Sequence, residues 1–213
     1  MFPIRGVECL RFTYRAYFGG VWPTYSTLAR HTGPTYLLTM RIAISGSHQT
    51  GKTTLSEALV AALPNYTLVP EPYHDLAEDG EPFADIPDLD TFEQLFAASI
   101  ATTTECDDNS ILDRCPFDML AYLTTHDEAD RFDLRRWMAE LQAAIQRLDL
   151  IVFVPIEVPD RIEAVDHRHL RNIVDAELRR LVLDDYLSFG VPAIEVTGSL
   201  RERVQNVLEH VKR

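Results

Sequence analysis

The chain contains few cysteines, and their positions exclude two kinds of scaffold. Cys9, Cys106 and Cys115 are an odd number in 213 residues, and they form none of the CxxC or Cys/His spacings that are typical of zinc ligands. We therefore expect neither a disulfide framework nor a structural zinc site. Because free thiols are kept reduced in the cytoplasm, this cysteine usage predicts a cytoplasmic protein.

Long apolar runs and an excess of positive charge are also missing. No apolar stretch approaches the roughly 20 residues of a membrane span, so we expect no membrane partner. The formal net charge is −13, which disfavours nucleic acid as a partner because nucleic-acid backbones attract basic surfaces. An acidic protein can still bind a nucleotide, since backbone N–H groups and a few arginines decide phosphate binding.

The first 39 residues differ in composition from the rest of the chain. They hold eight aromatic residues and four arginines against one acidic residue, and they show no sustained hydrophobic period. We interpret residues 1–39 as a poorly ordered extension, because Met40 opens the first β-rich run. A targeting peptide and a partner-binding arm remain the alternatives.

From Met40 onward, short β-rich runs alternate with helical patterns. This alternation predicts a three-layer α/β/α domain over residues 40–213, in which helices cover both faces of a five-stranded parallel sheet. Ligands of such sheets bind at the carboxyl ends of the strands. The expected strands are 41–45, 66–70, 110–113, 150–155 and 193–196, and the expected helices are 52–63, 91–104, 116–126, 132–148, 175–189 and 200–211.

The loop after the first expected strand carries the strongest chemical signal. Its sequence GSHQTGKT (46–53) fits the phosphate-loop pattern GxxxxGK[ST] at every fixed position. In this pattern backbone N–H groups and a helix N-terminus surround phosphate oxygens, Lys52 reaches the β- and γ-phosphates of ATP, and the Thr53 hydroxyl ligates Mg²⁺. The expected nucleotide-binding residues are Gly46, Ser47, His48, Gln49, Thr50, Gly51, Lys52, Thr53 and Thr54.

Two further strands end in side chains that suit phosphoryl transfer. Asp113 and Arg114 end one strand, and Glu71 follows another. Since the strand that carries Asp113 neighbours the first strand in this class of sheet, Asp113 should lie beside the phosphate loop and hold Mg²⁺ or contact the acceptor. Arg114 would face the transferred phosphoryl group. Either Glu71 or Asp113 would be the general base for an acceptor hydroxyl.

An arginine-bearing segment follows the fourth expected strand. Residues 157–172 include Arg161, Arg168 and Arg171. Phosphoryl-transfer enzymes use such segments as lids that exclude water and bring guanidinium groups to the triphosphate. We therefore expect a helical lid in which Arg168 and Arg171 contact ATP.

Taken together, these motifs resemble the kinase branch of phosphate-loop proteins. The order of the phosphate loop, Glu71-Pro72, Asp113-Arg114 and an arginine-bearing segment is similar to that of thymidylate and deoxynucleoside kinases. The stretch DRCPFDMLAYL (113–123) resembles the AAA-type ATPase/kinase family that includes the nicotinamide riboside kinase domain. This resemblance implies the phosphate-loop NTPase fold and an ATP- and Mg²⁺-dependent kinase with a small-molecule acceptor.

The sequence thus favours phosphoryl transfer from ATP to a hydroxyl of a small molecule, with nucleoside-like compounds as one acceptor class. The alternative is a regulatory ATPase that uses water as acceptor and whose nucleotide state controls a protein partner. A nucleotide-binding protein without turnover is a third interpretation. The oligomeric state stays open, a homodimer included.

Overall fold

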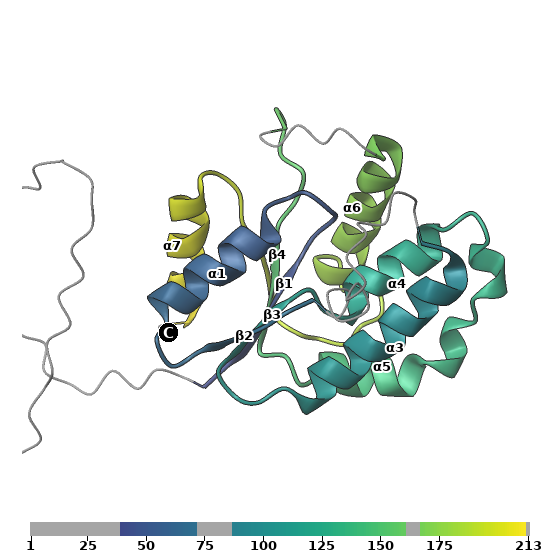
Figure 1. The fold of residues 1–213 in the computed structure, drawn as a ribbon, viewed down its shortest axis with the longest axis horizontal. Coiled ribbons are helices and arrows are strands. Elements are labelled where there is room, and N and C mark those ends of the chain that lie inside the picture. Colours follow the sequence, from purple (N-terminus) through teal and green to yellow (C-terminus); the bar gives the residue numbers. More distant parts are fainter. Residues whose placement is uncertain (1–38, 72–86, 161–166, 212–213) are drawn as a thin grey trace, which may run out of the picture. The chain divides into compact units, whose positions relative to one another are not determined.

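A parallel sheet of five strands organises the residues that the computed structural model describes, which are 39–71, 87–160 and 167–211 (Figure 1). The strand order is β2-β3-β1-β4-β5, and the register places Asp113 beside Ile44. The predicted sheet is confirmed, including the neighbouring positions of the first and third strands. The strands are β1 (Arg41–Ser45), β2 (Thr67–Val69), β3 (Ser110–Asp113), β4 (Leu150–Phe153) and β5 (Ala193–Glu195).

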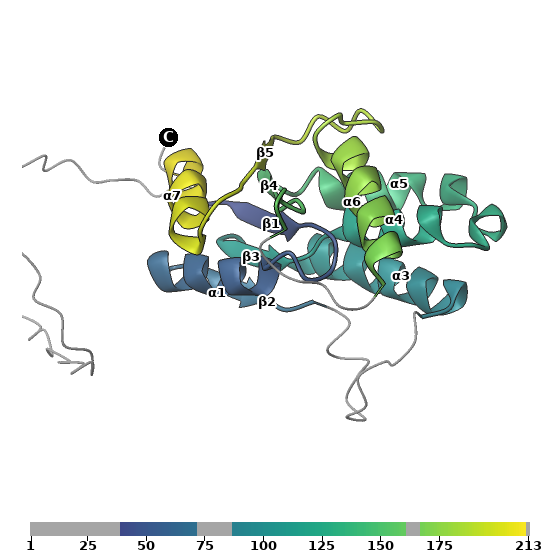
Figure 2. The ribbon, with the colours of Figure 1, turned by 90° about the horizontal axis from the view of Figure 1, so that it is seen from above.

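Helices cover both faces of the sheet, so the predicted three-layer architecture is confirmed (Figures 1 and 2). One face carries α1 (Lys52–Ala62) and α7 (Leu200–Val211). The other carries α3 (Leu89–Glu105), α4 (Pro116–Thr125), α5 (Met138–Ile145) and α6 (Arg168–Val182). Short 3₁₀ turns at Ala129–Arg131 and Leu134–Arg136 join α4 to α5.

Alternate side chains of the inner strands enter two separate apolar cores. In β1, Ile42 and Ile44 pack with residues of α1 and α7, whereas Ala43 packs with residues of α3 to α6. This follows from the two-residue period of a strand, which directs successive side chains to opposite faces. Burying one such aliphatic side chain contributes about 1.5–3 kcal/mol. The sheet is therefore a firm frame for the loops at its carboxyl edge.

Two predicted helices have bounds that differ from the structure by several residues. The helix expected at 132–148 begins only at Met138, because the Asp133 side chain binds the backbone N–H of Arg135 and favours a 3₁₀ turn before it. The helix expected at 175–189 is α6, which begins at Arg168 and ends at Val182. Asp185 stops any extension by accepting the N–H groups of two later residues, Phe189 and Gly190. Arg168 and Arg171 therefore lie on the first turns of a helix.

Two sequence-based expectations fall wholly or largely on residues outside the described ranges. These are the extension at 1–39 and Arg161 in the expected lid.

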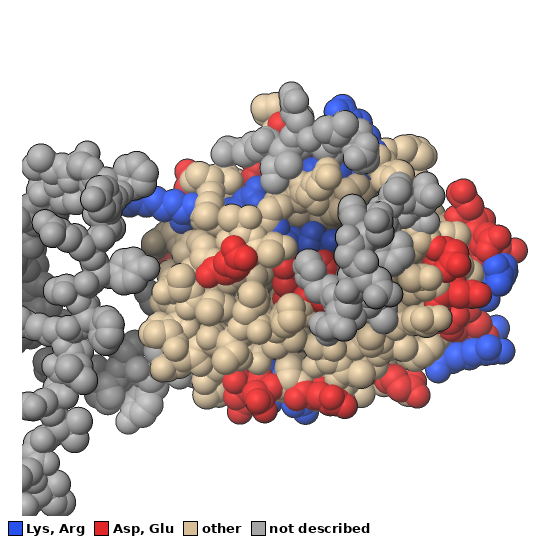
Figure 3. Space-filling view, viewed as in Figure 1, with Lys and Arg blue, Asp and Glu red and all other residues tan. Residues whose placement is uncertain are grey.

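Charged side chains are unevenly distributed on the face that Figure 3 shows. Acidic side chains gather along its lower edge and right side, where some basic side chains also lie, and further basic side chains reach the surface near its middle. Within the described part of the chain, no helix is both long and apolar enough to cross a bilayer.

Candidate active site

The phosphate loop lies between the end of β1 and the start of α1, and both of its fixed glycines are required by backbone geometry. A Cβ added to Gly46 would lie 2.5 Å from the carbonyl oxygen of Val154, which is closer than real contacts allow. Gly51 caps α1 with φ 87°, in the left-handed region that glycine adopts without strain. The loop can therefore turn sharply and direct successive N–H groups inward.

Lys52 is folded back onto the loop. Its Nζ donates to the carbonyl oxygen of Ser47 at 2.6 Å, and the same oxygen accepts from Thr50 Oγ1 at 3.1 Å. Lys52 is 5% exposed, and burial lowers its pKa to about 7, with the positive charge of Arg114 acting in the same direction. Its ammonium charge is thus weakly stabilised in the free protein. A bound phosphate would stabilise it strongly.

Glu71 and Arg114 meet at the carboxyl edge, because β2 and β3 are neighbours and each residue follows one of these strands. The Arg114 guanidinium forms an ion pair with Glu71 and donates to the carbonyl oxygen of Gly46 at 3.2 Å. Burial acts to lower the pKa of Arg114, but Glu71, Tyr122 and Asp118 raise it overall, so Arg114 keeps its charge. The carboxylate and the guanidinium that the sequence predicted at this edge therefore lie together beside the phosphate loop.

Asp118 is a site residue that the sequence interpretation missed. It is fully buried on α4, where Oδ1 accepts the Gly46 N–H at 3.0 Å and Oδ2 accepts the Cys115 N–H at 3.0 Å. Burial raises its pKa, and the nearby positive charges of Arg114 and Lys52 oppose that shift. The sequence signal was present in the capping-box spacing of Cys115 and Asp118. Asp118 thus joins the start of the phosphate loop to the start of α4.

Asp113 and Thr53 have oxygen atoms of the kind that Mg²⁺ prefers. Asp113 is 4% exposed at the end of β3, and its Oδ1 is buried without a hydrogen-bond partner among the described residues. Thr53 and its neighbour Thr54 are exposed at the start of α1. A buried carboxylate oxygen without a partner is costly unless a ligand or water completes it, so this donor set fits a hard cation.

The two arginines predicted to contact ATP from the lid have different surroundings. Arg168 is the exposed first residue of α6. Arg171, one turn later, is 2% exposed, and its guanidinium donates to the backbone carbonyl oxygens of His48 and Gln49 at 3.0 and 3.1 Å. Arg171 therefore contacts the outer side of the phosphate loop directly.

Arg203 is a second loop contact that the sequence interpretation missed. It lies on α7, and its Nη1 donates to the carbonyl oxygen of Thr50 at 2.8 Å. The sequence offered a signal here, because Arg203 shares a helix face with the buried residues Val207 and Val211 at four-residue intervals. A buried arginine on an apolar stripe requires polar partners nearby.

These features define a phosphate-loop NTPase fold, with a loop at the end of β1, a lysine at the start of α1 and charged side chains after β2 and β3. A family model described as an AAA domain matches residues 41–203, and the chain belongs to this family. None of the curated proteins matches the chain.

Solved structures of several kinases share the fold at low sequence identity. Deoxyadenosine kinase from M. mycoides with bound dATP has a TM-score of 0.54 and 12% identity, over 82% of this chain and 100% of that one. Thymidylate kinase from Ehrlichia chaffeensis has a TM-score of 0.57 and 15% identity, over 82% and 99%. The NadR protein in complex with NR has a TM-score of 0.59 and 18% identity, and this chain spans 50% of its length. At these identities the likeness establishes the fold.

Proposed function

We propose that the protein transfers the terminal phosphoryl group of ATP to a hydroxyl of a small molecule, with nucleoside-like compounds as the first acceptor class to test. The observation that carries this proposal is the Glu71–Arg114 ion pair beside the phosphate loop. It sets a carboxylate and a guanidinium where a hydroxyl nucleophile and the transferred phosphoryl group would meet. Two of the solved structures of similar fold, deoxyadenosine kinase and thymidylate kinase, are kinases, which supports the same class of reaction.

In the proposed reaction, the acceptor oxygen forms a bond to the γ-phosphorus while the bond from that phosphorus to the β–γ bridging oxygen breaks. Glu71 takes the proton from the acceptor hydroxyl, and ADP leaves. Of the two candidate bases, Glu71 is better placed because it is partly exposed, whereas Asp113 is buried. Lys52 and Arg114 stabilise the negative charge on the phosphoryl oxygens.

Asp113 and Thr53 would hold Mg²⁺, which when bound neutralises charge on the β- and γ-phosphates. The buried and unpartnered Oδ1 of Asp113 supports this assignment. Asp118 keeps the first glycine of the loop and Arg114 in place through its contacts with both.

An acceptor screen tests the proposal. ADP formation from Mg-ATP is measured with nucleosides, nicotinamide riboside, sugars and cofactor precursors, beside a control without acceptor. We expect at least one hydroxyl compound to raise turnover above the control. ATP turnover that no compound changes would support the regulatory ATPase instead.

We expect the affinity for Mg-ATP to fall as the pH rises above about 7. Below that pH, Lys52 is protonated in the free protein and in the complex, so its titration does not affect binding. Above that pH, Lys52 has lost its proton in the free protein. Binding of Mg-ATP then requires Lys52 to take up a proton, because the bound phosphate raises its pKa. The dissociation constant should therefore rise, by up to about tenfold per pH unit.

Calorimetry at pH 8 in two buffers with different ionisation enthalpies measures how many protons the protein takes up when Mg-ATP binds. We expect nearly one proton per bound nucleotide. Equal affinity at pH 7 and pH 9 together with zero uptake would contradict this role of Lys52.

A further inference from the structure

Four consecutive peptide groups of the phosphate loop have their carbonyl oxygens bound by cationic side chains. The carbonyl of Ser47 accepts from Lys52, those of His48 and Gln49 accept from Arg171, and that of Thr50 accepts from Arg203. In a planar trans peptide the N–H of the next residue points opposite to the carbonyl. The carbonyls of His48, Gln49 and Thr50 are held by side chains of α6 and α7, so the N–H groups that follow them are directed away from these helices, toward the space where phosphate would bind.

Arg171 acts at the most strained point of the loop. Gln49 has φ 55°, which makes it the one non-glycine residue of the loop in the left-handed region. The Nε and Nη2 atoms of Arg171 bind the two carbonyls that flank the Gln49 Cα. A planar guanidinium offers parallel donors for two acceptors at once, which a lysine ammonium does not. Such a conformation persists only when its surroundings hold it.

Arg203 holds the next peptide group from the opposite side of the sheet. Besides the Thr50 carbonyl, it donates to the Gly198 carbonyl at 3.1 Å through Nε and to Glu157 Oε1 at 2.9 Å through Nη2. Its side chain is 9% exposed. The guanidinium is therefore fixed on three sides before any ligand binds.

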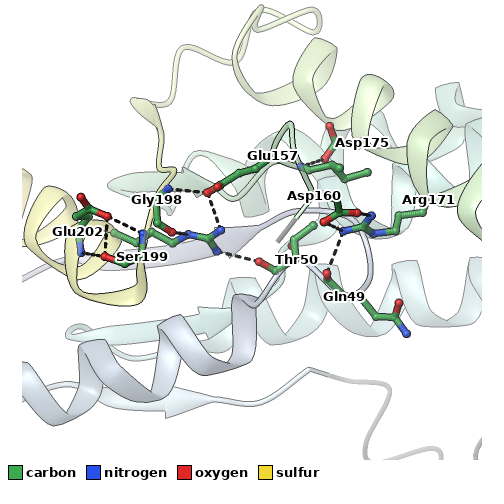
Figure 4. Close-up of polar contacts among 11 residues, drawn as sticks. Gln49, Thr50, Glu157, Asp160, Arg171, Asp175, Gly198, Ser199 and Glu202 are labelled. Carbon is green, nitrogen blue, oxygen red and sulfur yellow. Dashed lines mark hydrogen bonds and ion pairs between the residues drawn. The ribbon is translucent and has the colours of Figure 1, made fainter. Parts of the chain in front are cut away.

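Both arginines are anchored by carboxylates of the short segment that follows β4 (Figure 4). Asp160 forms an ion pair with Arg171, and Glu157 forms one with Arg203. The same segment is tied to α6 by the bond from Ile156 N to Asp175, and to the loop before α7 by the bond from Gly198 N to Glu157. These contacts join α6, α7 and the segment after β4 into one support for the loop.

We infer that Arg171 and Arg203 are positioning residues that hold the phosphate loop in its anion-binding conformation, with Asp160 and Glu157 as their anchors. Arg171 thus serves nucleotide binding through the loop backbone and not through a direct contact with the triphosphate. The inference rests on the part of the proposed function in which this loop binds phosphate, and it is independent of the acceptor.

The test measures binding of Mg-ATP, Mg-ADP and inorganic tripolyphosphate by calorimetry, without acceptor, to the variants Arg171→Lys and Arg203→Lys. Each variant keeps the positive charge but loses the planar set of donors. We expect a loss of affinity of about tenfold that is similar for all three ligands, because the loop N–H groups serve all of them. The matched control is Arg179→Lys on α6, whose arginine pairs with Glu195 outside the loop network, and it should bind as the wild type does.

Three results would overturn the inference. One is wild-type affinity in both folded variants. Another is a loss for Mg-ATP without a loss for Mg-ADP, which would mean direct contact with the transferred phosphate. The third applies if a lysine variant does not fold. Glu157→Ala and Asp160→Ala, which remove the anchors alone, then replace that variant, and wild-type affinity in both would refute the inference. A failed acceptor screen would refute the proposed reaction and leave these binding results unchanged.

Discussion

Replacing Lys52 by alanine is expected to lower turnover by about 10³-fold and to weaken Mg-ATP binding by about 10- to 100-fold. The variant loses the cation that would contact the β- and γ-phosphates, while the sheet and the loop backbone stay in place. Lys52 is buried, and its pKa is lowered to about 7, so burial disfavours its charge in the folded protein. The melting temperature of Lys52→Ala should consequently equal or exceed that of the wild type.

Steady-state turnover, calorimetry and a thermal melt give the three values. The chain contains one other lysine, so Lys212→Ala is a matched control for the loss of a lysine, and it should behave as the wild type does. A folded Lys52→Ala protein with unchanged affinity and turnover would refute the assignment of the phosphate loop.

Replacing Glu71 by glutamine should lower kcat by about 10²- to 10⁴-fold, because the amide cannot take the acceptor proton. The amide oxygen can still accept from Arg114, so the partner of Glu71 in the free protein is not lost. The affinity for Mg-ATP should therefore stay close to that of the wild type. Binding and chemistry would separate in this variant, which is the signature of a general base.

The measurement is steady-state turnover with an acceptor from the screen, beside the dissociation constant for Mg-ATP. Glu195→Gln is the control. Glu195 also lies at the carboxyl end of a strand, β5, and pairs with an arginine, but that arginine is Arg179, outside the phosphate-loop site. Wild-type kcat in Glu71→Gln would exclude Glu71 as the base and assign that role to Asp113. Loss of basal hydrolysis in Asp113→Asn, with Glu71→Gln unaffected, would instead favour the regulatory ATPase.

The parts of the fold that local patterns determine were predictable from the sequence. β3 spans 110–113 and α7 spans 200–211, as the apolar runs predict, and the loop at 46–53 joins a strand to a helix. In these segments hydrophobic period, turn chemistry and burial agree, so the sequence alone is sufficient.

The supports of the loop were not predictable in the same way, because they depend on contacts between distant parts of the chain. Arg171 is 123 residues from His48, and Arg203 is 153 residues from Thr50. Arginines near the fourth strand suggested a lid that contacts the triphosphate, since charge alone does not show whether a guanidinium meets a phosphate or a backbone carbonyl. The bounds of α6 were also mispredicted: the helix was expected to begin at 175, although the face marked by Val174, Leu178 and Leu181 continues back to Arg171.

Phosphorus NMR of the complete reaction tests the central claim most directly. The protein is incubated with Mg-ATP and the acceptor that gives the highest turnover, and the fate of the γ-phosphoryl group is followed. The account predicts a phosphomonoester signal that grows in equal amount with ADP and that is absent with Lys52→Ala. Release of inorganic phosphate as the sole phosphorus product besides ADP, in the presence of every acceptor in the screen, would contradict it.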